Sequence, residues 1–353
     1  MKDPYLEEDL QGIAKKISAE KELFQSRIFV TGGTGLVGSE IVRALLKMNE
    51  MYDAGITVCT LVRKMEKAKA VYREEAENPS LEFVIGDLEK PLEVDGEIDY
   101  IIHTASPTAS KFFVDHPVET LSIAIDGTRH VLELAKEKKS KGVVYLSSME
   151  AFGITDPNLT SVKEDDLGYI DIHHVRSSYS EGKRVCELLC SCYAAEYGVP
   201  VRIARLAQTF GAGIPYEENR VFAQFAKSAI HKEDIVLHTD GMSVGNYCYT
   251  SEAVEAILLL LVKGENGQAY TVANEASNTT IRGMAKMVAE KIAHNEIKVI
   301  FDIPKDSLTY GYAPAVKIQL NSQKLRALGW EPKIGLEESY RRMIASMLAT
   351  KEA

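Results

Sequence analysis

The sequence predicts an α/β protein with a doubly wound parallel sheet and a smaller lobe towards its C-terminus. Two features of the 353 residues predict this fold. Short β-branched runs alternate with longer amphipathic segments between residues 27 and 207, and the first run leads directly into a cluster of glycines. Alternating strands and helices form right-handed βαβ units, and these units place helices on both faces of one parallel sheet.

The predicted elements follow one another in order along the chain. Residues 1–24 are polar, with apolar residues at roughly helical spacing, and we expect an appended helix outside the main fold. Six apolar runs then predict strands, and four amphipathic stretches predict the helices between them. The strands are expected at 27–31, 56–62, 81–87, 100–106, 142–148 and 201–207, and the helices at 36–48, 65–77, 117–139 and 179–197.

The second half of the chain has a looser rhythm. Gly and Pro in FGAGIP (210–215) interrupt the alternation, and short extended pieces separate further helical stretches. We expect this half to form a lobe that closes over the carboxyl ends of the strands, where ligands bind in open α/β sheets. Its helices are expected at 220–231, 252–263, 280–293 and 336–349.

The composition argues against several classes of protein. A net charge of −10 argues against a nucleic-acid surface, and no apolar stretch approaches the ~18 residues that a membrane span needs. The charged start MKDPYLEEDLQ lacks the apolar core of a signal peptide. The five cysteines lack zinc-type spacing, so we expect reduced thiols and no metal site. These features predict a cytoplasmic protein without membrane or nucleic-acid partners.

The residues after the first strand predict a dinucleotide-binding loop of the Rossmann type. Glycines in TGGTGLVG (31–38) permit a tight turn and a close approach of the backbone to a pyrophosphate. The following helix offers free N–H groups to the phosphates. Because the loop lies between an apolar strand and an amphipathic helix, the signal is strong. The expected contacts with the dinucleotide are Gly32, Thr34, Gly35, Leu36, Val37 and Gly38.

The end of the second strand bears on the choice between NAD and NADP. An acidic residue there would bind the ribose hydroxyls of NAD, but the chain has Arg63 and Lys64 and no carboxylate before Glu66. Arg63 is expected to pair with the 2′-phosphate of NADP, which slightly favours NADP; the alternative is a solvated basic loop, with NAD held by other groups. Asp87 ends the third strand and is expected to bond the adenine. Further expected contacts with the dinucleotide are Leu88, Thr104, Ala105 and Ser106.

A tyrosine and a lysine one helical turn apart form the predicted catalytic pair. Tyr179 is the only one of the 16 tyrosines with a lysine, Lys183, four residues later. A free phenol has a pKa near about 10, and a nearby ammonium group favours the phenolate. Tyr179 can then take a proton from a hydroxyl while hydride leaves the same carbon for the cofactor. The alternative, an exposed pair on a helix, is disfavoured by the glycine loop upstream.

The end of the strand at 142–148 supplies two further candidate catalytic residues. The hydroxyl of Ser148 can bond the reacting oxygen and steady a developing carbonyl. Glu150, two residues later, can act as the general base for a proton next to a ketone. The alternative is that Glu150 is a surface glutamate that caps a loop.

The glycine loop, the strand end at Ser148 and the Tyr-x-x-x-Lys pair together resemble the extended short-chain dehydrogenase/reductase family. The similarity extends over about residues 26 to 347. Closer still, SPTASKFFVDHPVETL (106–121), the segment 179–211 and ENRVFAQF (218–225) look like the UDP-glucuronate decarboxylases. Nucleotide-sugar 4,6-dehydratases are near relatives of that branch.

The resemblance implies roles for individual residues and a division of the chain. It implies that Tyr179 is the catalytic base, that Lys183 modulates it and that Ser148 is its partner. It also implies that Arg220 contacts the nucleotide of the substrate and that Gln208 lies in the substrate site. The expected division is a Rossmann dinucleotide-binding domain at 25–208, to which parts of 240–275 return, and a mostly nucleotide-sugar-binding lobe at 209–353.

Several positions depart from these relatives. The decarboxylases have Thr-Ser-Glu where this chain has Ser148, Met149 and Glu150. Met149 also removes the acid with which the 4,6-dehydratases protonate the leaving 6-hydroxyl. The changes weaken the transfer of any one specific reaction and leave the hydride-transfer residues intact. Where the relatives have an arginine and two asparagines, the chain has Gly245, Gln208 and Ala124.

We therefore expect an NAD(P)-dependent epimerase or dehydratase that acts on a nucleotide-diphosphate sugar through a 4-keto intermediate. Three alternatives stay open: an enzyme like the UDP-glucuronate decarboxylases, an NADPH-dependent reductase of an activated sugar or polyol, and a non-catalytic dinucleotide sensor. The family commonly forms dimers through two helices, which here are residues 117–139 and 179–197. We therefore also expect a homodimer.

Overall fold

The computed structural model describes residues 3–303 and 317–351. Its centre is a seven-stranded sheet in which every neighbouring pair of strands is parallel. The order is β3-β2-β1-β4-β5-β6-β10, so the direction of winding reverses between β1 and β4. All six predicted strands are present, and a seventh joins them at one edge. The strands are β1 (Arg27–Thr31), β2 (Thr57–Val62), β3 (Leu81–Ile85), β4 (Tyr100–His103), β5 (Gly142–Ser148), β6 (Val201–Leu206) and β10 (Ala269–Val272).

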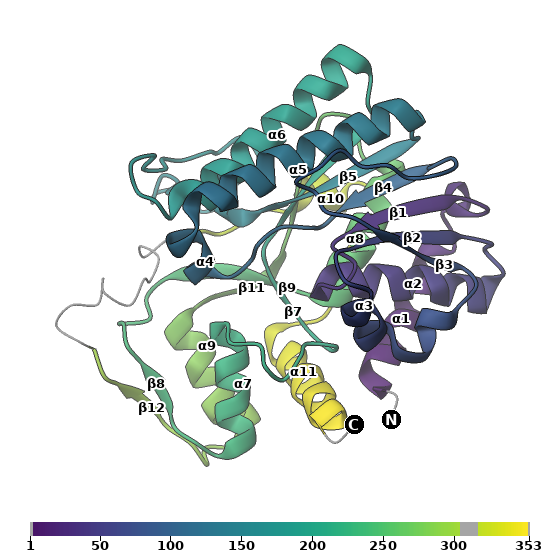
Figure 1. The fold of residues 1–353 in the computed structure, drawn as a ribbon. Coiled ribbons are helices and arrows are strands. Elements are labelled where there is room, and N and C mark those ends of the chain that lie inside the picture. Colours follow the sequence, from purple (N-terminus) through teal and green to yellow (C-terminus); the bar gives the residue numbers. More distant parts are fainter. Residues whose placement is uncertain (1–2, 304–316, 352–353) are drawn as a thin grey trace.

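Helices cover both faces of this sheet (Figure 1). α5 (Pro117–Lys138) and α6 (Ser177–Tyr197) lie side by side on one face and share a core with the strands. α2 (Leu36–Tyr52), α3 (Met65–Tyr72) and α8 (Thr250–Lys263) contribute to the core on the other face. The predicted doubly wound fold is therefore confirmed.

The first helix, α1 (Pro4–Ile17), is part of the main fold. Leu10, Ile13 and Ala14 form an apolar stripe that is buried in the same core as α2 and α8. Figure 1 shows α1 beside α2, below the sheet. The expectation that this helix lies outside the main fold is wrong, because a helix with such a stripe needs a partner to cover it.

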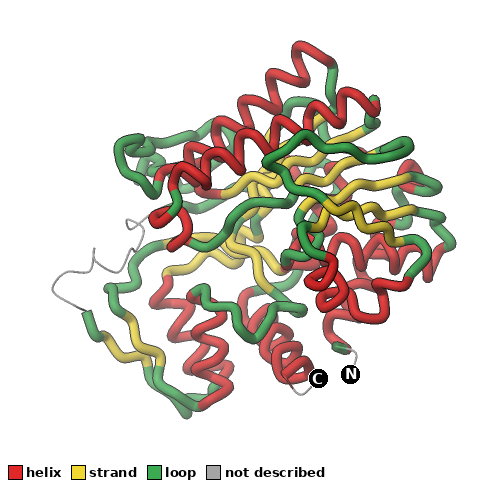
Figure 2. The backbone as a smooth tube through the Cα atoms, viewed as in Figure 1, coloured by secondary structure: helices red, strands yellow, loops and turns green. Residues whose placement is uncertain are grey.

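The second half adds two small sheets and three helices around a separate core (Figure 2). β9 lies between β7 and β11, and β8 pairs with β12. Phe210, Phe222 and Tyr340 are fully buried in the core between these elements. The elements are β7 (Gln208–Phe210), β8 (Ile235–Leu237), β9 (Val244–Tyr249), β11 (Asn274–Thr280), β12 (Val299–Phe301), α7 (Val221–His231), α9 (Ile281–Met287), which continues as a π turn (Val288–Ile292), and α11 (Leu336–Lys351).

Several short elements lie outside the expected pattern. The helix α4 (Ser110–Asp115) and the 3-10 turn η3 (Met149–Phe152) follow β4 and β5, and both border the site described below. No helix within the described residues is long and apolar enough to cross a lipid bilayer. The remaining short elements are η1 (Lys21–Leu23), η2 (Arg73–Glu77) and α10 (Gln323–Arg326).

Candidate active site

The loop between β1 and α2 has the geometry of an anion-binding site. β1 ends at Thr31, the chain turns through Gly32 with a φ of 71°, and α2 begins at Leu36. Gly35 is the N-cap residue and makes no side-chain capping bond, and the first turn of α2 carries no acidic residue. Free N–H groups and the helix dipole attract anions to such an end. The loop therefore fits the pyrophosphate of a dinucleotide.

The glycines of this loop have two different purposes. A Cβ on Gly38 would lie 2.3 Å from the carbonyl oxygen of Gly32, and a Cβ on Gly32 would lie 2.5 Å from Oγ1 of Thr104. Neither position has room for a side chain. A Cβ on Gly35 would have the Gly32 oxygen as its nearest neighbour, at 3.3 Å. Packing within the protein thus requires Gly32 and Gly38, whereas Gly35 leaves a path for a phosphate to the backbone.

The residues after β4 lie against the end of β1, where the same loop begins. Oγ1 of Thr104 donates a hydrogen bond to the oxygen of Thr31 at 2.7 Å, and the N–H of Ala105 donates to Oγ1 of Thr31 at 3.4 Å. Ser106 follows, and its hydroxyl donates to the oxygen of Pro107 at 3.2 Å. Two strand ends that are far apart in the sequence therefore form one wall.

The ends of β2 and β3 form the side on which an adenosine is expected. Arg63 and Lys64 follow β2 directly, and both side chains are exposed. Asp87 accepts a hydrogen bond from the N–H of Glu89 at 3.1 Å, and Leu88 is buried. Because β2 and β3 are paired, these residues share one edge of the sheet.

Ser148, Tyr179 and Lys183 come together at the end of β5. Ser148 is the last residue of β5, and Tyr179 and Lys183 lie in the first two turns of α6. The hydroxyl of Ser148 lies near enough to the phenol of Tyr179 to favour its ionisation. Nζ of Lys183 donates to the oxygen of Leu146 at 2.8 Å and lies 5.7 Å from the centre of the Tyr179 ring.

Burial shifts the pKa values of two of these groups. It raises the pKa of Tyr179 to about 12; the Glu150 carboxylate adds to this rise, and the charges of Arg176 and Arg220 oppose it. Burial lowers the pKa of Lys183 to about 8. We expected Lys183 to lower the pKa of Tyr179. In the protein without a bound dinucleotide, burial has the larger effect, and the pKa of Tyr179 is raised. An oxidised nicotinamide carries a positive charge and would act in the same direction as the two arginines.

Glu150 is bound by Arg176, which immediately precedes α6, and by Ser180 in the first turns of α6, and the sequence did not single out either residue. Arg176 donates from Nη1 to Oε2 at 2.8 Å and from Nη2 to Oε1 at 2.9 Å, and Ser180 donates to Oε2 at 3.0 Å. The side chain of Glu150 is only 30% exposed, so it differs from a surface glutamate that caps a loop. In the sequence, the only sign of an arginine near Glu150 and Tyr179 is that Arg176 lies three residues before Tyr179.

An aromatic ring covers one face of Tyr179. Phe113, from α4, stacks on the Tyr179 ring with a centroid distance of 4.2 Å and an interplanar angle of 10°. Its side chain is buried, and its backbone oxygen accepts a hydrogen bond from the hydroxyl of Ser178 at 3.3 Å. This contact excludes water from that face of the ring.

The residues predicted to hold the substrate lie on the second half of the chain. Arg220 is the N-cap residue of α7 and pairs with Glu218 at 2.8 Å. Its charge favours ionisation of the Tyr179 phenol, so it acts on the end of β5. Gln208 is exposed at the start of β7. A Cβ on Gly245 would lie 3.8 Å from Cε of Met149. Two positions that depart from the family pattern are therefore neighbours in space.

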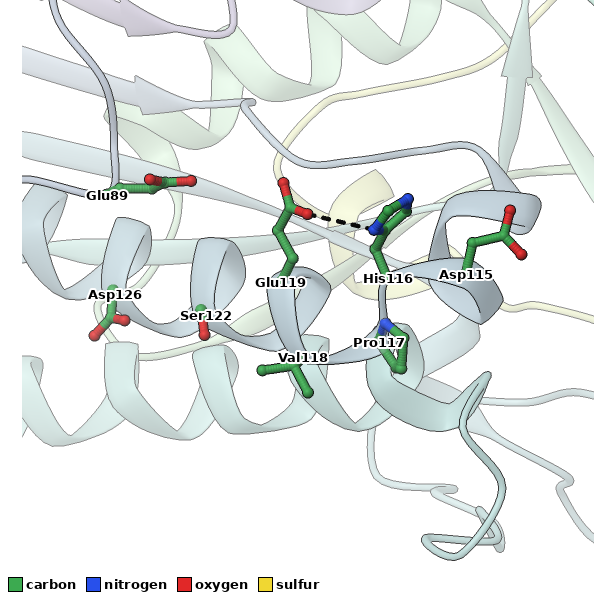
Figure 3. A pocket seen from close by; sticks show the side chains of 8 residues that line it. All are labelled: Glu89, Asp115, His116, Pro117, Val118, Glu119, Ser122 and Asp126. Atoms are coloured by element: carbon green, nitrogen blue, oxygen red, sulfur yellow. Dashed lines mark ion pairs between the residues drawn. The ribbon is translucent and has the colours of Figure 1, made fainter.

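A separate hollow of about 620 Å³ lies beside the N-terminal part of α5 (Figure 3). His116 and Glu119 face each other across part of it, at 3.7 Å. None of the predicted site residues lines this hollow. Its lining residues are Glu89, Asp115, His116, Pro117, Val118, Glu119, Ser122 and Asp126.

Proteins of known structure share this fold. The UDP-glucose 4-epimerase of Thermotoga maritima, solved with UDP-glucose, superimposes with a TM-score of 0.75 at 23% identity, over 92% of this chain and 99% of that one. The dTDP-glucose 4,6-dehydratase of Bacillus anthracis, solved with NAD, gives a TM-score of 0.72 at 18% identity, over 93% of this chain and 98% of that one.

Sequence comparison identifies closer relatives. UDP-glucuronic acid decarboxylase 6 of Arabidopsis thaliana is 32% identical over 320 residues, which are 90% of this chain and 88% of the relative. UDP-glucuronic acid decarboxylase 1 of Danio rerio is 28% identical over 330 residues, which are 93% of this chain and 74% of the relative. The family model of the NAD dependent epimerase/dehydratase family matches residues 28–274. The chain belongs to the NAD dependent epimerase/dehydratase family.

Proposed function

We propose that this protein is an NAD(P)-dependent enzyme that oxidises C4 of a nucleotide-diphosphate sugar and works through a 4-keto intermediate. The observation that carries the proposal is the meeting of Ser148, Tyr179 and Lys183 at the same edge of the sheet as the glycine loop. The family supports it, since its solved members bind UDP-glucose or NAD. A protein that only senses dinucleotides would have no use for an acid–base group at that place.

The residues of this chain have distinct tasks in such a reaction. A bound nicotinamide dinucleotide supplies the hydride acceptor. Tyr179, as phenolate, takes the proton of the sugar's 4-hydroxyl, and Ser148 donates a hydrogen bond to the same oxygen as it becomes a carbonyl. Lys183 adds positive charge near the Tyr179 ring, at 5.7 Å from its centre. Phe113 keeps water from the face of the ring that it covers.

A second candidate function follows from the curated relatives, which are UDP-glucuronic acid decarboxylases. A 4-keto group makes loss of carbon dioxide from C5 easier, so the same first step serves an epimerase, a dehydratase or a decarboxylase. A panel of nucleotide sugars with mass spectrometry distinguishes them. Loss of water indicates dehydration and loss of carbon dioxide indicates decarboxylation, whereas an epimer keeps the mass of the substrate and is recognised by its chromatographic separation from it. Gain of two hydrogens would instead indicate a reductase.

Tyr179→Phe tests the proposal most directly. The change removes one hydroxyl, so folding and dinucleotide binding should persist. Proton transfer by a positioned group is worth about 10²–10⁴ in rate, and turnover on the nucleotide sugar should fall by at least that factor. Calorimetry with the dinucleotide is the control for intact binding. Near-normal turnover of the variant would overturn the assignment of Tyr179.

We also propose that the cofactor site prefers NADP, because Arg63 and Lys64 directly follow β2 and are exposed. A charge-assisted contact with the 2′-phosphate is worth about 1.5–3 kcal/mol. Arg63→Asp should therefore lower the affinity for NADP by roughly tenfold to a hundredfold and favour NAD. Calorimetry with both dinucleotides measures this. Equal affinities of the parent protein for NADP and NAD would contradict the preference. This outcome has to be considered, because solved structures of the same fold contain NAD.

A homodimer through α5 and α6 completes the proposal. These helices pack against each other and expose apolar side chains, with Val118 76% and Leu188 65% exposed. Apolar side chains on adjacent helices are a common basis of symmetric interfaces. Sedimentation at micromolar protein should show a dimer, and a monomer alone would refute it.

A further inference from the structure

Three charged or polar groups around Tyr179 form an arrangement that the proposed first step does not use. Glu150 lies in η3, directly after β5, and Arg176 immediately precedes α6, three residues before Tyr179. The two terminal nitrogens of Arg176, Nη1 and Nη2, donate hydrogen bonds to the two Glu150 oxygens, at 2.8 and 2.9 Å. Ser180 holds Oε2 from the next turn, at 3.0 Å. The side chain of Arg176 is 14% exposed, so the pair is shielded from most solvent.

This pair lies beside Tyr179: Cζ of Arg176 is 5.9 Å from the centre of the Phe113 ring, and that ring stacks on Tyr179 at 4.2 Å. When the phenol gives up its proton, a second negative charge forms near the Glu150 carboxylate. Like charges disfavour each other strongly in a buried site. Accordingly, after burial, Glu150 is the influence that raises the pKa of Tyr179, and Arg176 opposes it. A bidentate arginine cancels the carboxylate's charge and fixes its orientation at the same time.

We infer that Arg176 is a positioning residue that neutralises Glu150 and thereby allows Tyr179 to ionise. This inference rests on the proposed role of Tyr179 as the base. It gives Glu150 a partner during the first hydride transfer, whatever reaction follows. Lysine at position 176 would keep the charge, whereas a neutral side chain of similar length would leave Glu150 uncompensated.

Other charged groups also face Tyr179, and the test must separate them from Arg176. Lys183 lies 5.7 Å from the ring centre, on the same helix, and Arg220 acts from the start of α7. Tyr145, on β5, is buried, and its pKa is raised well above its usual range, so it stays neutral. Phe113, from α4, brings no charge. None of these groups is altered by a substitution at Arg176.

The experiment follows the first hydride transfer as a function of pH in four variants. Reduction of bound cofactor is recorded in single turnovers with an excess of the nucleotide sugar that the panel identifies. The acid limb is the low-pH side of the curve of hydride-transfer rate against pH, where Tyr179 becomes protonated. In Arg176→Met this limb should move up by about one pH unit, since the loss of one positive charge near the phenol typically raises its pKa by at least that much. Glu150→Gln should move the limb down. The double variant Arg176→Met/Glu150→Gln should return close to the parent, and Arg176→Lys should stay close to it.

A second readout keeps the result independent of turnover. Isotope-labelled tyrosine NMR, with the Tyr179 signal assigned by its loss in Tyr179→Phe, follows the titration of the phenol in the dinucleotide complex. Its midpoint should move in the same directions as the limb. Arg341→Met, at an exposed ion pair on α11, is the control and should move neither.

The outcomes separate this inference from the proposed function. An Arg176→Met variant that is slower but has an unmoved limb and NMR midpoint would overturn the inference and leave Tyr179 as the base. A double variant no closer to the parent than Arg176→Met would also overturn it. If Arg176→Met fails to fold, a limb that does not move down in Glu150→Gln would overturn the inference as well. Full activity of Tyr179→Phe would instead remove the proposed function itself.

Discussion

The glycine loop and the candidate catalytic site around Tyr179 lie at the same edge of the sheet and are built in opposite ways. The loop is shaped by missing side chains: a Cβ on Gly32 or Gly38 would collide with backbone or Thr104 atoms less than 3 Å away. The candidate catalytic site is shaped by paired charges, above all Glu150 with Arg176. Substitution of the crowded glycines should therefore affect the fold, and changes in the candidate catalytic site should affect the chemistry.

The largest expected effect on stability breaks the loop. Gly38→Ala would place a Cβ 2.3 Å from the oxygen of Gly32, on rigid backbone, and should cost about 3 kcal/mol of unfolding free energy. Gly35→Ala is the matched variant, because its Cβ has 3.3 Å to the same oxygen. It should fold and instead lose affinity for the dinucleotide. Urea denaturation and calorimetry measure the two effects, and equal destabilisation by both changes would contradict the distinction.

The same contrast explains what the sequence could predict. The loop and the parallel strands depend on local patterns, so β1 to β6 and the crowded glycines were accessible from the chain alone. The Tyr179 and Lys183 pair was accessible because both residues lie on one helix. Arg176 was not, because its role depends on where Glu150 lies, 26 residues earlier in the chain.

The first helix shows a second limit of sequence-based prediction. Its periodicity predicts α1, but its partners are α2 and α8, and α8 lies more than 200 residues away. Asp9 of α1 also pairs with Arg342 at 2.9 Å, near the other end of the chain. Long-range contacts of this kind leave no local pattern, so the helix was expected outside a fold to whose core it contributes.

The next largest expected effect is on the pH dependence of stability, and it comes from a histidine between the glycine loop and the site around Tyr179. His103 ends β4, and its Nδ1 shares a hydrogen bond with Oγ1 of Thr31 at 2.7 Å. Burial, and then the charge of Lys183, lower the pKa of His103 to about 3. The unfolded chain therefore binds a proton near pH 6.5 that the folded protein does not bind, and stability falls as the pH falls through this window.

This group alone should cost about 2.5 kcal/mol of unfolding free energy between pH 7 and pH 4.5. His103→Asn keeps a polar group beside Thr31 but cannot take up the charge. Its urea denaturation should lose less stability over the same interval, by about that amount, since the carboxylates titrate in both proteins. Parallel losses in the two proteins would show that folding does not lower the pKa of His103.

The smallest expected effect on stability is that of Lys183→Met. This substitution should slow hydride transfer without destabilising the fold. Lys183 is buried, its pKa is lowered to about 8, and its charge is therefore held at a cost to folding of about 3 kcal/mol at neutral pH. Lys183→Met removes that cost but leaves the oxygen of Leu146 without its donor and loses the contact with the Tyr145 ring, together about 2 kcal/mol. The variant should be as stable as the parent, or more stable by about 1 kcal/mol, while its hydride transfer slows.

The pH dependence of stability checks the same balance at Lys183. Between about pH 8 and pH 10 the folded parent has released the lysine proton, whereas the unfolded chain still holds it. The unfolding free energy of the parent should therefore rise through this window relative to that of Lys183→Met, which has no proton to release. Urea denaturation of both proteins at pH 7 and pH 9.5 measures the two effects. A strongly destabilised Lys183→Met variant would mean that the candidate catalytic site, like the glycine loop, is required for the fold.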